Sequence, residues 1–250
     1  MQFIVPHYNL KPFNVLGPNL RIVCSKLKRH PHSFLRLQQY HLNLYITDNL
    51  LKLFCVVTLR DRMKALGIAF SARKNGNCAK LLRYCLNNLK KREFDTELLE
   101  AYDFQLTPCS HCNYECFSEE CPIKDDIPLF YEKAMKADVL IFAVPTYGGH
   151  ASGLYRTFCE RGQAVFKSYD EWNNFARKLN FIVVGNLSSG GDMALHEVLY
   201  GTTASEYWPE AILVSSNEYM KSSVKGDLIE EDEIGAQISR FVERIIQKMG

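Results

Sequence analysis

Four cysteines lie within thirteen residues of one another near the middle of the 250-residue chain, and they are the side chains best suited to metal or redox chemistry: Cys109, Cys112, Cys116 and Cys121. Thiolates at such short spacing can converge on one centre without help from distant parts of the chain. Four Cys ligands suit either a 4Fe–4S cluster or a tetrahedral zinc ion, and the Cys-Pro pair that ends the run favours iron–sulfur. The sequence shows no convincing secretory signal, so we expect metal or redox chemistry rather than disulfides, with four free thiols as the remaining alternative.

A second set of useful side chains lies in a turn, Ser71 to Asn77, between a strand-like and a helical pattern. Such a turn exposes free backbone N–H groups and the positive end of a helix dipole, which together bind anions. Ser71, Asn75 and Asn77 can add hydrogen bonds, and Arg73 or Lys74 can add positive charge. The turn is neither a Walker loop nor a GxGxxG loop. We therefore expect an anion site of another kind, or a turn with a purely structural role.

Two further turns carry glycines directly after apolar runs. The first, 145–150, reads Pro-Thr-Tyr-Gly-Gly-His, and its glycines let the backbone approach a flat ring on which Tyr147 can stack. The second, 185–191, reads Gly-Asn-Leu-Ser-Ser-Gly-Gly. Either turn alone also fits an ordinary connection between a strand and a helix, so its meaning depends on where the fold places it.

Hydrophobic periodicity predicts the elements that position these turns. Short apolar runs predict five buried strands, at 65–70, 94–100, 138–144, 181–185 and 211–215. Apolar residues at helical spacing predict helices at 81–89, 125–136, 152–166, 192–204 and 230–249. Strands that alternate with helices predict a parallel sheet covered on both faces.

Right-handed crossovers then favour an α/β, doubly wound, five-stranded sheet of flavodoxin-like order 2-1-3-4-5. Ligands of such sheets bind outside the carboxyl ends of the strands, at the switch point between the first and third. The three turns follow strands one, three and four, so all three emerge at that edge. Each turn alone is a weak signal, but their shared position at one edge of the sheet predicts a single site.

Composition is that of an ordinary globular protein, with 47% apolar and 23% charged residues. Residues 1–62 hold nine Lys/Arg and two Asp, a net charge of +7, whereas residues 63–250 carry a net −5. We expect 1–62 to be a basic, poorly structured extension, or untranslated if translation begins at Met63, and 63–250 to be the folded domain with a cysteine loop at 103–124. The acidic domain argues against nucleic acid as a partner, and the sequence has no run long enough for a membrane helix.

Residues 63–245 resemble the flavodoxin-like NAD(P)H-dependent FMN reductases. The run 69–78 is similar to that family's phosphate loop, 145–148 to its flavin turn, Ser152-Gly153 to the start of the next helix, Arg161 to an arginine near that helix's end, and 190–191 to the end of its third loop. The resemblance implies FMN, with its phosphate on 71–77 and its ring between 145–148 and 186–191. Cys78 stands where the family has Thr or Ser, which leaves a weaker donor. The cofactor-binding residues implied are Ser71, Arg73, Asn75, Gly76, Asn77, Cys78, Pro145, Thr146, Tyr147, Gly148, Asn186, Gly190 and Gly191.

The cysteine loop resembles that of the iron–sulfur flavoprotein branch of the same family, although its middle gap is three residues rather than two. That branch implies an oxidoreductase that passes electrons between FMN and a 4Fe–4S cluster, with NAD(P)H or a ferredoxin-type donor, as a cytoplasmic homodimer or homotetramer. No Ser-His-acid or Cys-His arrangement is evident, so we expect no catalytic side chain. The alternatives are a cluster-free NAD(P)H:FMN or quinone reductase and a non-catalytic electron carrier.

Overall fold

The computed structural model describes residues 42–45, 54–57, 62–110, 112–113, 115–186, 188–202 and 207–249. The chain divides into two units, Met1–Asp61 and Arg62–Gly250. In the first unit, strand β1 (Leu42–Tyr45) pairs antiparallel with β2 (Phe54–Val57). The rest of the predicted extension lies outside the described residues. No helix in the described part of the chain is long and apolar enough to cross a membrane.

Five parallel strands form the centre of the second unit: β3 (Lys64–Ala69), β4 (Asp95–Glu100), β5 (Val139–Tyr147), β7 (Leu179–Gly185) and β8 (Ala211–Ser215). Their order is β4-β3-β5-β7-β8, and every neighbouring pair is parallel. This is the predicted order 2-1-3-4-5, which is confirmed. A two-residue strand, β6 (His150–Ala151), pairs antiparallel with the end of β5 and was not predicted.

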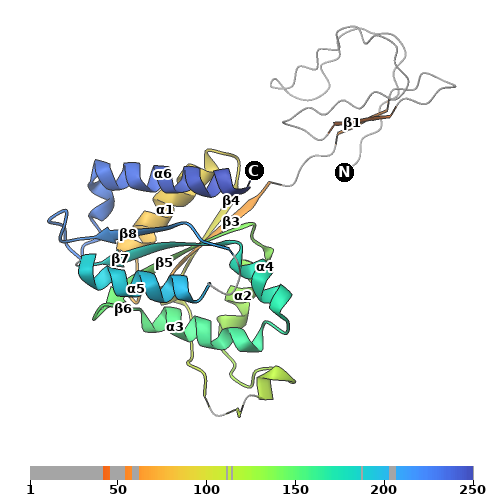
Figure 1. Ribbon diagram of the computed structural model, residues 1–250, viewed down its shortest axis with the longest axis horizontal. Helices are drawn as coiled ribbons and strands as arrows, with labels where there is room; N and C mark the ends of the chain where they lie inside the picture. The colour runs from red at the N-terminus through yellow and green to blue at the C-terminus, as the bar shows by residue number, and fades with distance from the viewer. Residues whose placement is uncertain are drawn as a thin grey trace, which may run out of the picture. The chain divides into compact units, whose positions relative to one another are not determined.

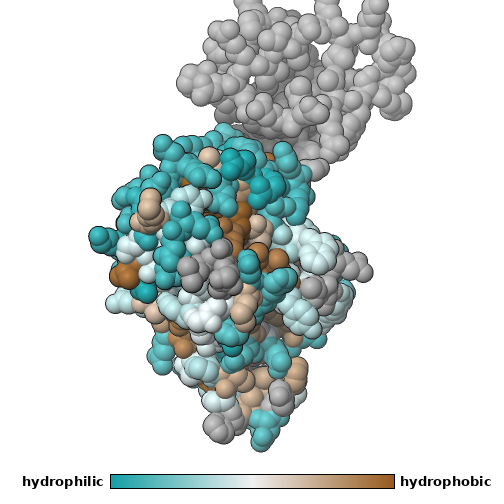
Figure 2. Space-filling view, turned by 60° about the vertical axis from the view of Figure 1, so that its left-hand side comes forward, coloured by the Kyte–Doolittle hydropathy of each residue, from teal (hydrophilic) through white to brown (hydrophobic). Residues whose placement is uncertain are grey.

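Helices cover both faces of this sheet, as Figure 1 shows. One face carries α1 (Asn77–Lys90) and α6 (Asp232–Met249), and the other carries α2 (Ile127–Lys136), α3 (Gly153–Glu160), α4 (Tyr169–Ala176) and α5 (Ser188–Tyr200). Successive side chains of a strand point to opposite faces, so β3 sends Ala65 and Ala69 toward α1 and Leu66 and Ile68 toward the other layer. The apolar strands are therefore covered on both sides. In Figure 2, hydrophilic side chains occupy most of the visible face of this unit, with smaller apolar patches between them.

An aromatic cluster fixes the point where the first turn leaves the sheet. Phe70, the residue after β3, is fully buried. Its ring lies edge-on to Phe142 at 5.2 Å and to Tyr155 at 5.4 Å between ring centroids. Its backbone N–H also donates to the carbonyl of Ala143, at 2.9 Å. The large side chain at position 70 thus anchors the turn that follows it.

Two predicted helices differ from the structure at their ends. α3 ends at Glu160 rather than continuing to 166, and a 3₁₀ helix, η3 (Arg161–Ala164), follows it. Arg161, the first residue of this 3₁₀ helix, has its guanidinium buried in an ion pair with Asp125 of the loop before α2. α5 begins at Ser188, so residues 188–191 are its first turn rather than part of the predicted loop. Gly191 fits inside this helix because a Cβ there would lie 2.2 Å from the Leu213 side chain of β8.

The connection from β4 to α2 holds the cysteines and two short 3₁₀ helices, η1 (Ala101–Asp103) and η2 (Glu115–Phe117). A further 3₁₀ helix, η5 (Leu228–Glu230), precedes α6. The helix α4 was not predicted from the sequence. Its start is capped by Ser168, whose hydroxyl accepts a hydrogen bond from the Glu171 backbone N–H at 3.2 Å.

Ser152→Ala tests the link between the start of α3 and the first turn. The buried Ser152 hydroxyl accepts from the Tyr155 N–H at 3.3 Å and donates to the Phe70 carbonyl at 2.7 Å, so its loss leaves two buried groups unpaired. We expect the free energy of unfolding to fall by about 2 kcal/mol in urea titrations. Ser168→Ala, at an exposed cap, is the control and should cost about 1 kcal/mol or less. Equal effects would show that the Phe70 contact contributes nothing.

Candidate functional site

The three predicted turns begin next to one another at the carboxyl edge of the sheet. Ala69 of β3 pairs with Ala143 of β5, and Pro145 of β5 pairs with Val184 of β7. The turn at 70–76 therefore leaves β3 beside the end of β5, and Asn186 follows β7 beside the last residues of β5. The parallel sheet brings together the segments that the sequence predicted as one site.

The first turn presents backbone donors at the start of α1. Ser71 is buried, and its hydroxyl accepts from the Arg73 N–H at 3.1 Å. Asn75 adopts the left-handed conformation (φ 54°), and Gly76 is the residue that precedes the helix. The first N–H groups of a helix have no acceptor within it. This turn can therefore offer backbone N–H groups to an anion.

Two of the predicted polar side chains instead hold a neighbouring segment, 222–228. The amide of Asn77 donates to the Ser222 carbonyl and accepts from the Leu228 N–H, both at 3.2 Å. Arg73 donates to the Ser223 carbonyl at 2.5 Å. Sequence reasoning missed this segment, because a loop that follows the last strand carries no periodic pattern. The side chains of Arg73 and Asn77 thus connect the first turn to the 222–228 segment.

Cys78 also has a different environment from the one its sequence position suggested. Its side chain is buried in the core on the α1 face, and burial raises the pKa of its thiol to about 12. The thiol therefore stays protonated at neutral pH and packs as a small apolar group. Only its backbone N–H, in the first turn of α1, is suited to an anion.

A carboxylate that the sequence did not single out lies beside the first turn. Glu100, the last residue of β4, is buried, forms an ion pair with Arg83 and accepts from the Asn75 N–H at 2.9 Å. Lys74 is paired with Asp103 at 2.6 Å. The Glu100 contact fixes the left-handed residue of the turn. The sequence alone does not distinguish a buried, paired glutamate such as Glu100 from an exposed one.

The second turn is a tight β-hairpin rather than a simple passage from strand to helix. Tyr147 of β5 pairs with His150 of β6, and Gly148 and Gly149 between them have φ of 58° and 85°. Positive φ at both central residues is the requirement of a type I′ hairpin turn. A Cβ at Gly148 would meet nothing within 4 Å, and Tyr147 is 44% exposed. The hairpin therefore offers open backbone against which a flat ring can lie.

Glu197 of α5 supports this hairpin and was also missed by the sequence analysis. Its carboxylate accepts from the Ala151 N–H at 3.0 Å and forms an ion pair with Arg156 at 2.6 Å. His150 lies 3.8 Å from the same carboxylate. These contacts fix the return strand of the hairpin to α5.

The third segment is connected to the residues after β8. Asn186 accepts through its backbone carbonyl from the Ser215 hydroxyl at 3.1 Å and through its side chain from the Ser216 hydroxyl at 2.8 Å. Its amide oxygen is thus engaged, which leaves the amide NH₂ as its donor. Gly190 and Gly191 lie in the first turn of α5, and Leu187 is outside the described residues. Pro145 is buried and Thr146 half-buried at the end of β5.

The four clustered cysteines line a single pocket of about 260 Å³. Cys112 and Cys116 are buried, Cys121 is half-buried and Cys109 is exposed, and none of these four described cysteines forms a disulfide. Desolvation raises the pKa of the Cys116 thiol, and the hydrogen bond to Cys112 and the nearby Cys121 and Cys109 raise it further. Over the described ranges, no group of three or more His, Cys, Asp or Glu side chains is already arranged to hold a single metal ion. The structure thus places the predicted ligands along the wall of one cavity, and they are not arranged to coordinate a single ion.

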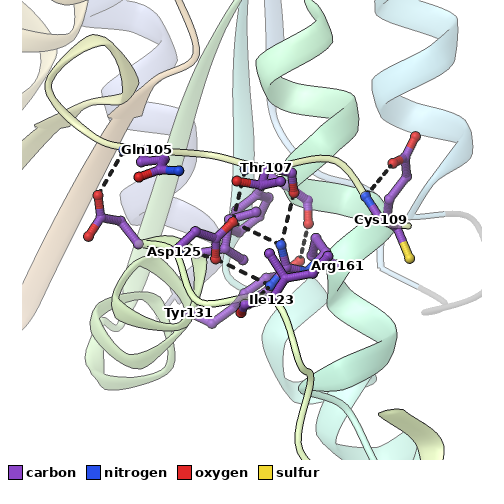
Figure 3. Close-up of polar contacts among 11 residues, drawn as sticks. Gln105, Thr107, Cys109, Ile123, Asp125, Tyr131 and Arg161 are labelled. Carbon is purple, nitrogen blue, oxygen red and sulfur yellow. Dashed lines mark hydrogen bonds and ion pairs between the residues drawn. The ribbon is translucent and has the colours of Figure 1, made fainter. Parts of the chain in front are cut away.

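The end of α3 and the residues after it hold this loop through three charged side chains, of which Figure 3 labels Arg161, close to Thr107 of the loop. Glu160 accepts from the Cys109 N–H at 3.4 Å, and Arg161 donates to the Thr107 carbonyl at 2.8 Å. Lys167 donates to the Cys116 carbonyl at 2.5 Å. The loop is thus anchored at several points along its length, as a preformed binding site requires.

Comparisons with known proteins agree with these features. A family model described as NADPH-dependent FMN reductase matches residues 63–223. An iron–sulfur flavoprotein of Methanocaldococcus jannaschii is 30% identical over 129 residues, which are 52% of this chain and 65% of that protein. An iron–sulfur flavoprotein of Methanosarcina thermophila is 28% identical over 181 residues, which are 70% of this chain and 88% of that protein. The resemblance inferred from the motifs is confirmed.

Solved structures confirm the fold. An NADH:FMN oxidoreductase in its apo form has a TM-score of 0.52 and 13% identity, covering 73% of this chain and 88% of that chain. An azoreductase has a TM-score of 0.52 and 11% identity, covering 74% of this chain and 99% of that chain. At such low identity these structures establish the architecture alone.

Asn77→Ala tests whether the Asn77 side chain holds the 222–228 segment. Its removal leaves a buried N–H and a carbonyl without partners, so we expect about 2 kcal/mol of destabilisation. Hydrogen exchange followed by mass spectrometry should show faster exchange confined to 222–228 and the first turn of α1. Asn87→Ala, on the exposed side of α1, should change neither. Unchanged exchange at 222–228 in the Asn77 variant would contradict this role.

Proposed function

Because the chain belongs to the NADPH-dependent FMN reductase family, we propose that it is an oxidoreductase that binds FMN at the carboxyl edge of its sheet and an iron–sulfur cluster on its cysteine loop. The observation that carries the cluster is the convergence of four cysteines on one pocket. The observation that supports an FMN site is that the turn before α1 and the open glycine hairpin after β5 lie at the same edge of the sheet. Bound FMN would supply two-electron chemistry, and the cluster would supply one-electron transfer.

The phosphate of FMN fits the first turn through backbone donors. The N–H groups at the start of α1 and the positive end of the helix dipole favour a dianion there. Ser71 and Asn75 lie in this turn, with Asn75 fixed by Glu100. Arg73 and Asn77 hold the 222–228 segment beside it. In this proposal the side chains shape the turn and the backbone binds the phosphate.

The flat ring of FMN fits against the Tyr147–His150 hairpin and the residues after β7. Gly148 and Gly149 adopt positive φ and carry no side chain, so a flat ring can approach their backbone closely. Backbone N–H groups there would stabilise negative charge on a bound flavin ring without reorganising. Tyr147 can cover one edge of the ring, since its side chain is partly exposed. NAD(P)H, the donor named for the family, is the proposed source of electrons.

The cysteine pocket fits a cluster better than a single ion. A tetrahedral zinc ion has metal–sulfur bonds of about 2.3 Å, so its four sulfurs crowd around one point. A 4Fe–4S cluster is also held by four cysteines but occupies the space of several atoms. The four cysteines are among the residues that line a cavity of about 260 Å³, which has room for more than a single ion. The chemistry of four thiol donors and the size of the cavity both support the cluster.

Cys112→Ala tests the cluster. We expect anaerobically purified variant protein to lose most of its iron and acid-labile sulfide and to keep its FMN, because the two sites use different segments. Cys85→Ala, which removes a buried thiol in α1, is the control and should keep the iron of the wild type. Wild-type iron in the Cys112 variant would overturn the ligand assignment. Zinc in place of iron in the wild type would favour the zinc alternative.

Gly148→Ala tests the ring site. A residue with a Cβ is strained at positive φ, by roughly 1 kcal/mol or more, and must move the hairpin that the ring contacts. We expect FMN to bind the apoprotein about tenfold more weakly in fluorescence titrations, which corresponds to about 1.4 kcal/mol. Gly153→Ala, where an added Cβ also meets nothing within 4 Å, should bind FMN like the wild type. An unchanged affinity in the Gly148 variant would place the ring elsewhere.

A further inference from the structure

A buried ion pair lies at the base of the cysteine loop. The side chains of Arg161 and Asp125 are 2% and 0% exposed, and two hydrogen bonds of 2.8 and 3.2 Å join them. Taking two charges out of water is costly, and the pair is stable only when further hydrogen bonds satisfy both groups. The remaining donors of Arg161 and acceptors of Asp125 must therefore find hydrogen-bond partners in the surrounding chain.

Most of those donors and acceptors go to the two ends of the loop (Figure 3). Arg161 donates to the Thr107 carbonyl at 2.8 Å on one side and to the Ile123 carbonyl at 3.5 Å on the other. Asp125 accepts from the Thr107 N–H at 2.8 Å. It also accepts from the Ile127 N–H, at 3.3 Å. The pair thus ties together the segments that enter and leave the run of four cysteines.

One donor of the pair is left over. The Nε–H of Arg161 is buried and has no hydrogen-bond partner among the described residues. A buried N–H without an acceptor costs about 1–3 kcal/mol, and the cost is higher for a charged group. Arg161 also lines the same pocket as the four cysteines. An acceptor placed in that pocket would satisfy this donor.

We infer that Arg161 is the positioning residue of the cysteine site. With Asp125 it holds both ends of the loop, and its Nε–H donates to a sulfur atom of the centre that the cysteines bind. This inference rests on the proposed cluster and adds a role that the ligands alone do not supply. A hydrogen bond to sulfur stabilises the more negative, reduced state, so it raises the reduction potential of the centre.

The test uses Arg161→Lys, which keeps the positive charge beside Asp125 and removes the Nε donor. In dithionite titrations of the full chain with redox mediators, followed by electron paramagnetic resonance, we expect the cluster to become about tenfold harder to reduce. That change corresponds to 59 mV for one electron. Lys124→Gln is the control: it removes an exposed cation at the end of the same loop, next to Asp125 in the chain, and it should leave the potential within about a third of that shift.

A second measurement uses the metal-free protein, in which the pair of Arg161 and Asp125 holds the two ends of the loop without any bound ligand. Hydrogen exchange in 105–123 should become faster in Arg161→Lys and stay as in the wild type in Lys124→Gln. If Arg161→Lys does not fold, the double variant Arg161→Met with Asp125→Leu replaces the pair by apolar side chains, a change that buried pairs often tolerate. The same lowered potential is expected for it.

The outcomes separate the two proposals. Wild-type protein that takes up no iron and sulfide overturns the proposed cluster and with it the role of the Nε donor. A loaded cluster whose potential is the same in Arg161→Lys and wild type overturns this inference and leaves the proposed function standing. Faster exchange with an unchanged potential also overturns it, because the residue would then be structural only.

Discussion

A parallel sheet covered by helices on both faces leaves only the ends of its strands free for chemistry. In this chain the carboxyl ends of β3, β5 and β7 lie side by side; β3 continues into the turn before α1, and β5 continues into the glycine hairpin. The aromatic packing of Phe70 and the Ser152 hydroxyl fix where the first segment starts. Glu100 and Glu197 fix two of the turns from neighbouring elements. The proposed FMN site depends on this arrangement.

The sheet does not position the cysteine loop, because the loop lies between β4 and α2 and belongs to no regular element for most of its length. Its position comes from charged side chains around the end of α3, above all the buried pair of Arg161 and Asp125. A flexible loop would pay the entropy of ordering when it binds a cluster, whereas a loop already tied at both ends has paid part of it during folding.

Much of the fold could be predicted from the sequence, because buried strands and amphipathic helices carry strong periodic patterns. The strand order, inferred from the alternation of strands and helices, and the family, inferred from the resemblance of its motifs, are both confirmed. Family membership also confirms that the chain is an oxidoreductase. The start of α5 was misplaced because Gly190 and Gly191 look like loop residues, although Gly191 packs beneath Leu213 inside the helix. The contacts of Asn77 and Glu100 could not be predicted, since they join residues far apart in the chain.

The most direct test of the central claim is the content of iron, acid-labile sulfide and FMN per chain after anaerobic purification of the wild-type protein. We expect about four iron and four sulfide per chain, together with bound FMN and visible absorption from both groups. FMN without iron or sulfide, after reconstitution under reducing conditions, would contradict the cluster and favour a cluster-free reductase. Absence of both FMN and iron would contradict the whole assignment of the two sites.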